Sequence, residues 1–384
     1  MSFMILYIYN SNLVIMFFLT WTYFINYENY LNFMMMYLTF FLMKMIFFSM
    51  KEKMNNYFFF LKKKVTLMLM IMLLVFFYTK NMMQFYVVFE LISLMIFSLI
   101  FFSSFSNQRL KASIYMFMFM GMSTFPMLIM LFFLNEKIMM YIFLIGFMIK
   151  IPMMFFHLWL PKAHVEANFY DSMILASLLL KLGGYGLMII YMNKKMNFFY
   201  FWSLITILFM SMNMLMMMDL KMVFAYSSII HMNGMVLMLI SNSLFTEKMF
   251  IIMMISHALS SSLMFFMMGM TYEMTLSRSM MINKNFMLNS NMLFMIIFIT
   301  MFANMSMPPM MTFFSEMLMY FSLMNFSKKM FIMLMMIMFM SIMFNLIILK
   351  NFSMSKLNKF FKMNQVKTSN LILYMEHLML MFLM

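Results

Sequence analysis

The sequence lacks cysteine entirely and has little charge, glycine or proline. Charged residues make up 10% of its 384 residues, beside 7 glycines and 5 prolines. A chain without cysteine has no disulfide bond, no iron–sulfur ligand and no thiol chemistry. No glycine-rich phosphate loop occurs, so we expect no bound nucleotide. Because globular domains carry about 25% charged residues, the composition excludes a soluble globular protein.

Long apolar segments fill the sequence instead. Hydrophobic residues account for 66% of the chain, and the mean hydropathy is +0.95. Lipid cannot satisfy the backbone groups of open structures other than helices. With about 20 apolar residues needed per helix, the sequence predicts an all-α polytopic membrane protein with about 13 transmembrane helices. The predicted crossings are 3–21, 31–50, 65–79, 81–103, 112–134, 138–160, 172–192, 198–218, 222–242, 249–270, 291–323, 329–349 and 370–384.

Two of these segments carry prolines that predict discontinuous helices. Pro152 closely follows Lys150, and Pro308 and Pro309 interrupt the segment 291–323, which is too long for one straight helix. Proline removes a backbone donor and disrupts a helix. Broken helices near the middle of the membrane are the usual architecture of ion sites in transporters. We therefore expect helix breaks near Lys150–Pro152 and Pro308–Pro309.

We expect a single transmembrane domain over residues 1–384, because the stretches between apolar segments are short. Within it, residues 1–80 hold the N-terminal helices and residues 81–349 the core with the buried charges. Residues 350–384 hold a basic loop and the C-terminal helix.

The formal net charge of +15 comes from lysines between the apolar segments. With loops numbered by the crossings that they join, even loops carry 16 Lys and Arg residues and odd loops carry 7. Lys and Arg gather on the positive-inside face of a membrane protein, so we expect the even loops and the N-terminus there. We reject nucleic-acid binding for the same reason. Loop charges such as Asp219, Lys221, Glu247 and Arg278 are expected to be solvated or to contact neighbouring subunits.

Methionine and phenylalanine are unusually frequent, with 75 and 54 copies. This bias is typical of an AT-rich genome whose code reads an Ile-like codon as Met, as in animal mitochondria. The N-terminus has no Arg-rich presequence and no signal-peptide pattern,. We therefore expect a mitochondrial protein made inside the organelle.

Four ionisable residues lie near the middle of apolar segments: Glu90, Lys150, Lys181 and Glu316. A charge at that depth costs at least about 2.5–3.5 kcal/mol, so such residues are usually paired or functional. Two acids and two bases on separate segments predict a proton or cation path. Glu90 is expected to pair with a membrane lysine, because a neighbouring carboxylate stabilises the charged ammonium.

Less specific interpretations exist for three of these residues. Glu90 could only hold helices together, and Lys150 could extend to a membrane face, although both faces lie about ten residues away,. The glycines Gly183, Gly184 and Gly186 near Lys181 favour close helix packing. They also let the helix deform so that water could reach the lysine.

His231 and His257 lie on the segments 222–242 and 249–270, among small and polar neighbours. Histidine titrates near neutrality, so both are candidates for a proton relay. The alternative is that each is satisfied by a serine. His157 and His164 could hold a metal, but no residues have typical metal-ligand spacing, so we expect none.

Long motifs occur between about residue 85 and the C-terminus. They are His157–Ala167, Ser172–Ala176, Leu179–Gly186, Asp219–Lys221, Ala225–Ile229 with His231, Ser256–Leu259, and Pro308–Pro309 with Glu316. In these motifs the chain resembles chain 4 of mitochondrial NADH:ubiquinone oxidoreductase, respiratory complex I, a family of antiporter-like proton-pumping subunits. The resemblance implies two inverted repeats, each with one broken helix.

The resemblance also implies a function. The residues that match Glu90, Lys150, Lys181 and Glu316 form the central hydrophilic axis of that family, with histidines such as His231 and His257 between the last two. Such a subunit couples electron transfer from NADH to ubiquinone to proton translocation across the mitochondrial inner membrane. It belongs to an NADH:ubiquinone reductase but holds no redox centre and no catalytic residue.

Further expectations concern cofactors, partners and location. NADH, FMN, iron–sulfur clusters and ubiquinone would bind to the whole complex and not to this chain. Its partners would be other membrane-arm subunits and the lipid bilayer, without nucleic acid or a directly bound soluble substrate. The N-terminus would face the matrix.

Some positions depart from the family pattern. The stretch Ala167–Asp171 lacks the usual Ala-Pro, and Asp171 adds a charge. The alternative function is a subunit of a multi-subunit cation/proton antiporter, which is similar in this fold. An assembly subunit without pumping is disfavoured because the axis residues are retained.

Overall fold

The computed structural model describes residues 30–50, 57–79, 81–102, 107–132, 136–191, 197–240, 246–283, 291–326, 328–354 and 368–383. Helices make up nearly all of these residues, and the only extended pairing among them is a bridge between Asp219 and Ser279. By packing, the chain divides into two compact units, Met1–Met95 and Ile96–Met384. The expected single domain with three parts stays a prediction, and the first expected crossing, 3–21, lies outside the described residues.

The unit Met1–Met95 contains α3, α4 and most of α5. Helix α3 covers Tyr30–Met50, α4 covers Tyr57–Tyr78, and α5 covers Met82–Phe101 and continues into the second unit. The rings of Phe76 and Phe85 lie 4.6 Å apart, which packs α4 against the start of α5. The expected crossing 65–79 was too short, because the helix begins at Tyr57 and includes the lysines 62–64.

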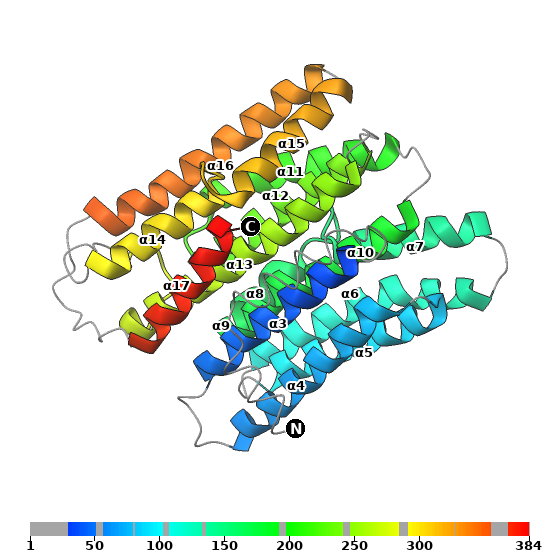
Figure 1. The fold of residues 1–384 in the computed structure, drawn as a ribbon, viewed down its shortest axis with the longest axis horizontal. Helices are drawn as coiled ribbons and strands as arrows, with labels where there is room; N and C mark the ends of the chain where they lie inside the picture. Colours follow the sequence, from blue (N-terminus) through cyan, green and yellow to red (C-terminus); the bar gives the residue numbers. More distant parts are fainter. Residues whose placement is uncertain are drawn as a thin grey trace. The chain divides into compact units, whose positions relative to one another are not determined.

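The unit Ile96–Met384 is a bundle of long helices with two interruptions (Figure 1). Helices α12 and α13 lie in its interior, since 89% and 94% of the most apolar stretch of each is buried. Helix α11 packs on α12, and α13 contacts α9, α12, α14, α15 and α17. The helix bounds are α6 Asn107–Phe132, α7 Glu136–Lys150, α8 Trp159–Glu166, α9 Phe169–Ile174, the π-helical η3 Leu175–Leu179, α10 Leu180–Tyr191, α11 Asn197–Met216, α12 Leu220–Ile240, α13 Thr246–Thr275, α14 Asn291–Asn304, α15 Met311–Phe326, α16 Lys328–Met354 and α17 Thr368–Leu383.

Both predicted helix breaks are confirmed. Helix α7 ends at Lys150 and α8 begins at Trp159, while α14 ends at Asn304 and α15 begins at Met311. Each break contains a residue in the left-handed region, Phe155 with φ 73° and Ser306 with φ 49°. Such a conformation costs about 1–2 kcal/mol in an L-residue, so the surrounding packing must hold it. Helices α14 and α15 both pack against the long α16 (Figure 1).

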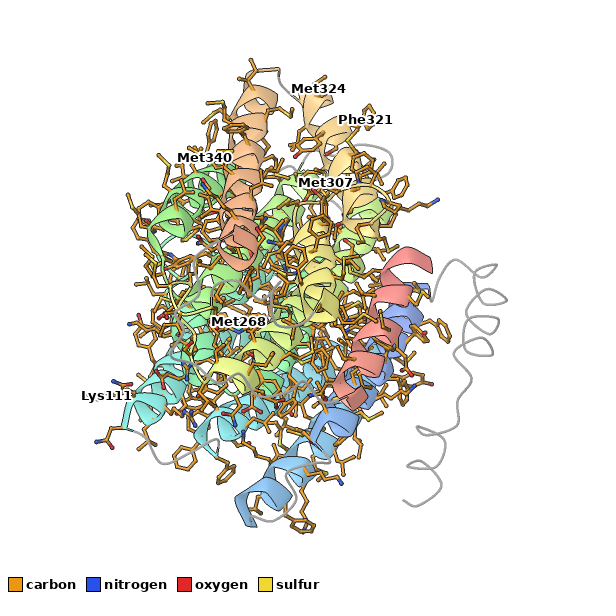
Figure 2. All side chains as sticks on the ribbon, turned by 90° about the vertical axis from the view of Figure 1, so that its left-hand side faces the viewer. Lys111, Met268, Met307, Phe321, Met324 and Met340 are labelled. Atoms are coloured by element: carbon orange, nitrogen blue, oxygen red, sulfur yellow. The ribbon has the colours of Figure 1, made fainter. Side chains whose placement is uncertain are left out.

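Length and composition support a membrane protein. Seven described helices are long and apolar enough to cross a bilayer, and three shorter apolar helices accompany them. Apolar side chains also face outward: Phe321 and Met324 on α15 are 62% and 48% exposed (Figure 2). Met268 on α13 is buried, whereas Lys111 projects from the start of α6 (Figure 2). The predicted all-helical polytopic fold is thus confirmed, with methionine serving both the interior and the outer surface.

Candidate functional site

Lys181 lies near the start of α10, directly after the π-helical turn η3. Its side chain is fully buried, and Nζ donates a hydrogen bond to the carbonyl oxygen of Ala176 at 2.8 Å. A second contact, 2.7 Å long, joins Nζ to Nδ1 of His257. Single π-helical turns occur frequently at functional sites. The predicted deformation near Lys181 is therefore present, but it precedes the lysine and does not start at the glycines.

The glycines after Lys181 allow α10 to approach α7 closely. A Cβ atom at Gly183 would lie 3.2 Å from Cβ of Lys150, and one at Gly186 would overlap the ring of Phe147. Any side chain at Gly186 would therefore force the ring of Phe147 or the two helices to move. The glycine packing that the sequence predicted brings the backbones that carry Lys150 and Lys181 together.

Lys150 is the last residue of α7 and is 2% exposed. A cation at a helix C-terminus is stabilised by the helix dipole and by carbonyl groups without intrahelical partners. The break that follows is tied to α12, because Nδ2 of Asn233 donates to the carbonyl oxygen of Pro152 at 3.1 Å. Lys150 thus occupies the buried helix end that the sequence predicted.

The two candidate histidines face each other from neighbouring helices. His231 on α12 and His257 on α13 have ring centroids 5.6 Å apart. His257 is almost fully buried, and its Nδ1 contacts Lys181, while the hydroxyl of Ser260 bonds only to the backbone carbonyl of His257. The alternative that a serine side chain satisfies this ring nitrogen of His257 is therefore wrong.

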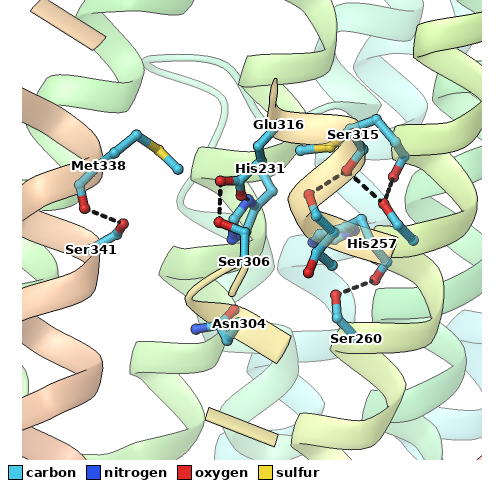
Figure 3. Close-up of polar contacts among 12 residues, drawn as sticks. His231, His257, Ser260, Asn304, Ser306, Ser315, Glu316, Met338 and Ser341 are labelled. Carbon is cyan, nitrogen blue, oxygen red and sulfur yellow. Dashed lines mark hydrogen bonds and ion pairs between the residues drawn. The ribbon is translucent and has the colours of Figure 1, made fainter. Parts of the chain in front are cut away.

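Glu316 completes this group from α15 (Figure 3). Its Oε1 lies 3.3 Å from Nδ1 of His231, an ion-pair distance without the alignment of a hydrogen bond. Ser306, in the break between α14 and α15, donates a hydrogen bond to Oε2. Glu316 is 3% exposed, so its charge depends on these contacts. A hydroxyl pair, Ser256 and Ser315 at 3.1 Å, lies beside it.

The structure therefore joins four predicted residues in one buried series: Lys181, His257, His231 and Glu316. Each comes from a different helix, namely α10, α13, α12 and α15. Lys181 and His257 lie at hydrogen-bond distance, the ring centroids of His257 and His231 lie 5.6 Å apart, and His231 and Glu316 lie at ion-pair distance. Such a series can carry a proton, because every member can both accept and release one.

Glu90 lies on α5, in the part of that helix that belongs to the unit Met1–Met95. Its Oε1 is buried and has no hydrogen-bond partner among the described residues. Its pairing with a membrane lysine stays a prediction.

Two loop charges lie in surroundings that the sequence did not predict. Lys221 is not solvated but is 6% exposed, and its Nζ donates to the carbonyl oxygen of Ala167 at 2.5 Å. Arg278 is partly buried and donates to the carbonyl oxygen of Val165 at 2.6 Å. Their positions beside apolar segments gave no signal of these contacts, which depend on how α8, α12 and the end of α13 meet.

Other polar residues near the breaks were not predicted. Ser306 and Asn304 precede the two prolines, and polar residues inside an apolar segment are the signal that could have found them. His377 on α17, which the sequence could not place, is buried with Nε2 2.9 Å from the hydroxyl of Ser262.

The expectation that the chain holds no metal stays a prediction. In the part of the chain that the structure describes, no group of three or more His, Asp or Glu residues could hold an ion. His164 instead stacks on Phe265 with ring centroids 4.6 Å apart.

The fold and the site together define a polytopic, all-helical membrane protein with two interrupted helices and a buried series of ionisable side chains. The chain belongs to the family described as NADH:quinone oxidoreductase/Mrp antiporter, TM, whose sequence profile matches residues 130–342.

Curated relatives carry the name NADH-ubiquinone oxidoreductase chain 4. The protein of Rhipicephalus sanguineus is 31% identical over 286 residues, which is 64% of this chain and 61% of that protein. The protein of Apis mellifera ligustica is 33% identical over 287 residues, covering 64% and 60%. The chain thus spans about 60% of the length of the curated relatives that it matches.

Solved structures share the fold at low sequence identity. A chain of respiratory complex I from Thermus thermophilus with bound NADH is 16% identical, with a TM-score of 0.81, and the match covers 93% of this chain and 80% of that chain. A chain of the membrane-bound sulfane sulfur reductase, an archaeal respiratory membrane complex, also gives a TM-score of 0.81 at 14% identity, covering 92% and 77%.

Proposed function

We propose that this chain is an antiporter-like proton-translocating subunit of NADH:ubiquinone oxidoreductase. It contributes to coupling electron transfer from NADH to ubiquinone to proton movement across the mitochondrial inner membrane. The observation that carries the proposal is the buried series from Lys181 through His257 and His231 to Glu316. The family and the relatives named chain 4 support it.

The geometry suggests how a proton passes along this series. Lys181 Nζ and His257 Nδ1 are 2.7 Å apart, so a proton on the amine can move to the imidazole when that nitrogen is free to accept it,. His257 passes a proton to His231, whose ring centroid lies 5.6 Å away, a separation across which a water molecule could relay it,. His231 then delivers it to the carboxylate of Glu316 at 3.3 Å.

The two ends of the path are assigned from the sequence. Glu90 pairs with a membrane lysine and sets its proton affinity, and Glu316 leads towards the outer face, as the resemblance implies. The excess of Lys and Arg in the even loops supports an N-terminus on the matrix side,.

Redox chemistry belongs to other subunits. The chain has no cysteine, so its residues do not fit an iron–sulfur cluster, and it has no glycine-rich loop for NADH or FMN,. Its partners are other membrane-arm subunits and the surrounding lipid.

The first test locates the chain. Peptide mass spectrometry on the NADH-oxidising complex from native inner membranes should find it in fixed ratio to the other subunits. A second candidate is a subunit of a multi-subunit cation/proton antiporter, because the family description names that class beside the oxidoreductase. Recovery only from a smaller assembly with sodium-dependent transport and no NADH oxidation would support that candidate and reject the first.

The second test addresses the path. We expect Lys181→Met to leave the complex assembled, because a buried apolar side chain replaces a buried ammonium of similar length. The proton-to-electron ratio should fall, since His257 loses its donor. Lys162→Met is the matched control, because this exposed lysine lies over the ring of Tyr115 at 4.0 Å, outside the series. An unchanged ratio in Lys181→Met would reject the role of Lys181.

A further inference from the structure

Two cations converge on the C-terminal end of α8, the half-helix after the first break. Lys221 Nζ donates to the carbonyl oxygen of Ala167 at 2.5 Å, and Arg278 Nη1 donates to that of Val165 at 2.6 Å. The last carbonyl groups of a helix lack intrahelical partners and carry partial negative charge. Both cations therefore bind where α8 ends and the chain turns into α9.

Lys221 is unusually buried for a lysine at the start of a helix, with 6% of its surface exposed. Opposite charges surround this corner. Asp171, in the first turn of α9, is 2% exposed and interacts electrostatically with Lys221. Glu166, the last residue of α8, lies 3.9 Å from Arg109 on α6. Burying an ammonium costs free energy unless its partners compensate, and here the carbonyl oxygen of Ala167 and the carboxylate of Asp171 act against the repulsion from Arg278.

The two donors are also joined to each other through the backbone. Asp219 and Ser279 form an antiparallel bridge, the amide of Leu220 donates to the carbonyl oxygen of Arg278 at 3.1 Å, and the amide of Met280 donates to that of Met218 at 3.0 Å. The segment before α12 and the segment after α13 are therefore held as one unit. Lys221 and Arg278 reach α8 from this common base.

Along the sequence, this corner lies between Lys150 and Lys181. Going backward, α8 leads through the break to Lys150; going forward, α9 and η3 lead to Lys181. We propose that Lys221, together with Arg278, is a positioning residue that clamps the α8–α9 corner and so fixes the contact between Lys181 and His257. This inference rests on the proposed proton path, and it gives Asp171 a role as countercharge to Lys221.

The test uses the assembled complex with Lys221→Met, Lys221→Arg and, as matched control, Lys162→Met on the exposed side of α8. Amide hydrogen exchange across residues 163–172 reports on the corner, since exchange follows local opening. The proton-to-electron ratio reports on the axis. We expect at least tenfold faster exchange and a reduced ratio in Lys221→Met, partial recovery of both in Lys221→Arg, and no change in Lys162→Met.

The two readouts separate the proposals. Unchanged exchange in Lys221→Met would overturn the clamp, whatever the ratio. Faster exchange with a normal ratio, when Lys181→Met lowers that ratio, would overturn the positioning role alone. A normal ratio in Lys181→Met would reject the proposed path. Amide exchange in Lys221→Met would still show whether Lys221 holds the corner. Should Lys221→Met not assemble, Lys221→Gln, which keeps a donor without the charge, is judged by the same two criteria.

Discussion

In the first interrupted helix the ionisable side chain precedes the break, whereas in the second it follows the break. Lys150 is the last residue of α7, where the helix dipole favours a cation by about 0.3–1 kcal/mol,. Glu316 is the sixth residue of α15, beyond the first turn, where the dipole has weakened,. Its charge instead depends on His231 and Ser306.

This difference separates a break held mainly by backbone packing from one held mainly by side chains. The close contact of α10 with α7, through Gly183 and Gly186, shapes the surroundings of Lys150. Direct side-chain contacts shape those of Glu316. Substitutions that add bulk should therefore affect the first break most, and substitutions that remove charge should affect the second.

The largest effect is expected for Gly186→Ala. The new methyl group would overlap the ring of Phe147, and overpacking of this kind costs about 1–3 kcal/mol,. We expect a marked loss of assembled complex, measured by native gel and immunodetection. Gly121→Ala on α6 is the control, because its Cβ would lie 3.3 Å from the exposed and movable ring of Phe125. Equal yields of the two variants would show that backbone proximity does not govern the first break.

The second prediction concerns the charge at the other break. Glu316→Gln keeps an acceptor for Ser306 but removes the carboxylate that faces His231. We expect normal assembly and a proton-to-electron ratio well below that of the unmodified complex, measured in sealed vesicles. Glu247→Gln, at an exposed position in the first turn of α13, should leave the ratio unchanged. A normal ratio in Glu316→Gln would mean that the carboxylate is structural.

The smallest effects are expected for the asparagine hydrogen bonds at the two breaks. Asn233→Leu removes the donor to Pro152, and Asn345→Leu removes the acceptor for the side-chain amide of Asn304. One hydrogen bond contributes about 0.5–1.5 kcal/mol to stability. Amide exchange should rise at residues 151–158 only in the first variant and at residues 305–310 only in the second. A rise at both breaks in either variant would show that the two interruptions are coupled.

The helix breaks could be predicted from the sequence because proline removes a backbone donor and disrupts a helix, although Pro126 lies inside the continuous helix α6. Glu316, Lys181 and the two histidines could be chosen because a charge or imidazole inside an apolar segment stands out. Their contacts could not be predicted, since they join residues on four helices far apart in the sequence. Lys221 illustrates the limit: at the edge of an apolar segment it resembled a solvated lysine, yet it lies buried against Ala167.

Composition, the long apolar segments and the prolines by themselves predicted an all-helical membrane protein, its two interruptions and the ionisable residues inside its apolar segments. These are local properties, set by hydrophobicity, proline geometry and the cost of charge in lipid. Tertiary structure alone decided that Lys181 meets His257, that Glu316 meets His231 and Ser306, and that Lys221 meets the carbonyl oxygen of Ala167. Those contacts arise from how helices pack, which depends on the shapes of many side chains at once and on no single segment.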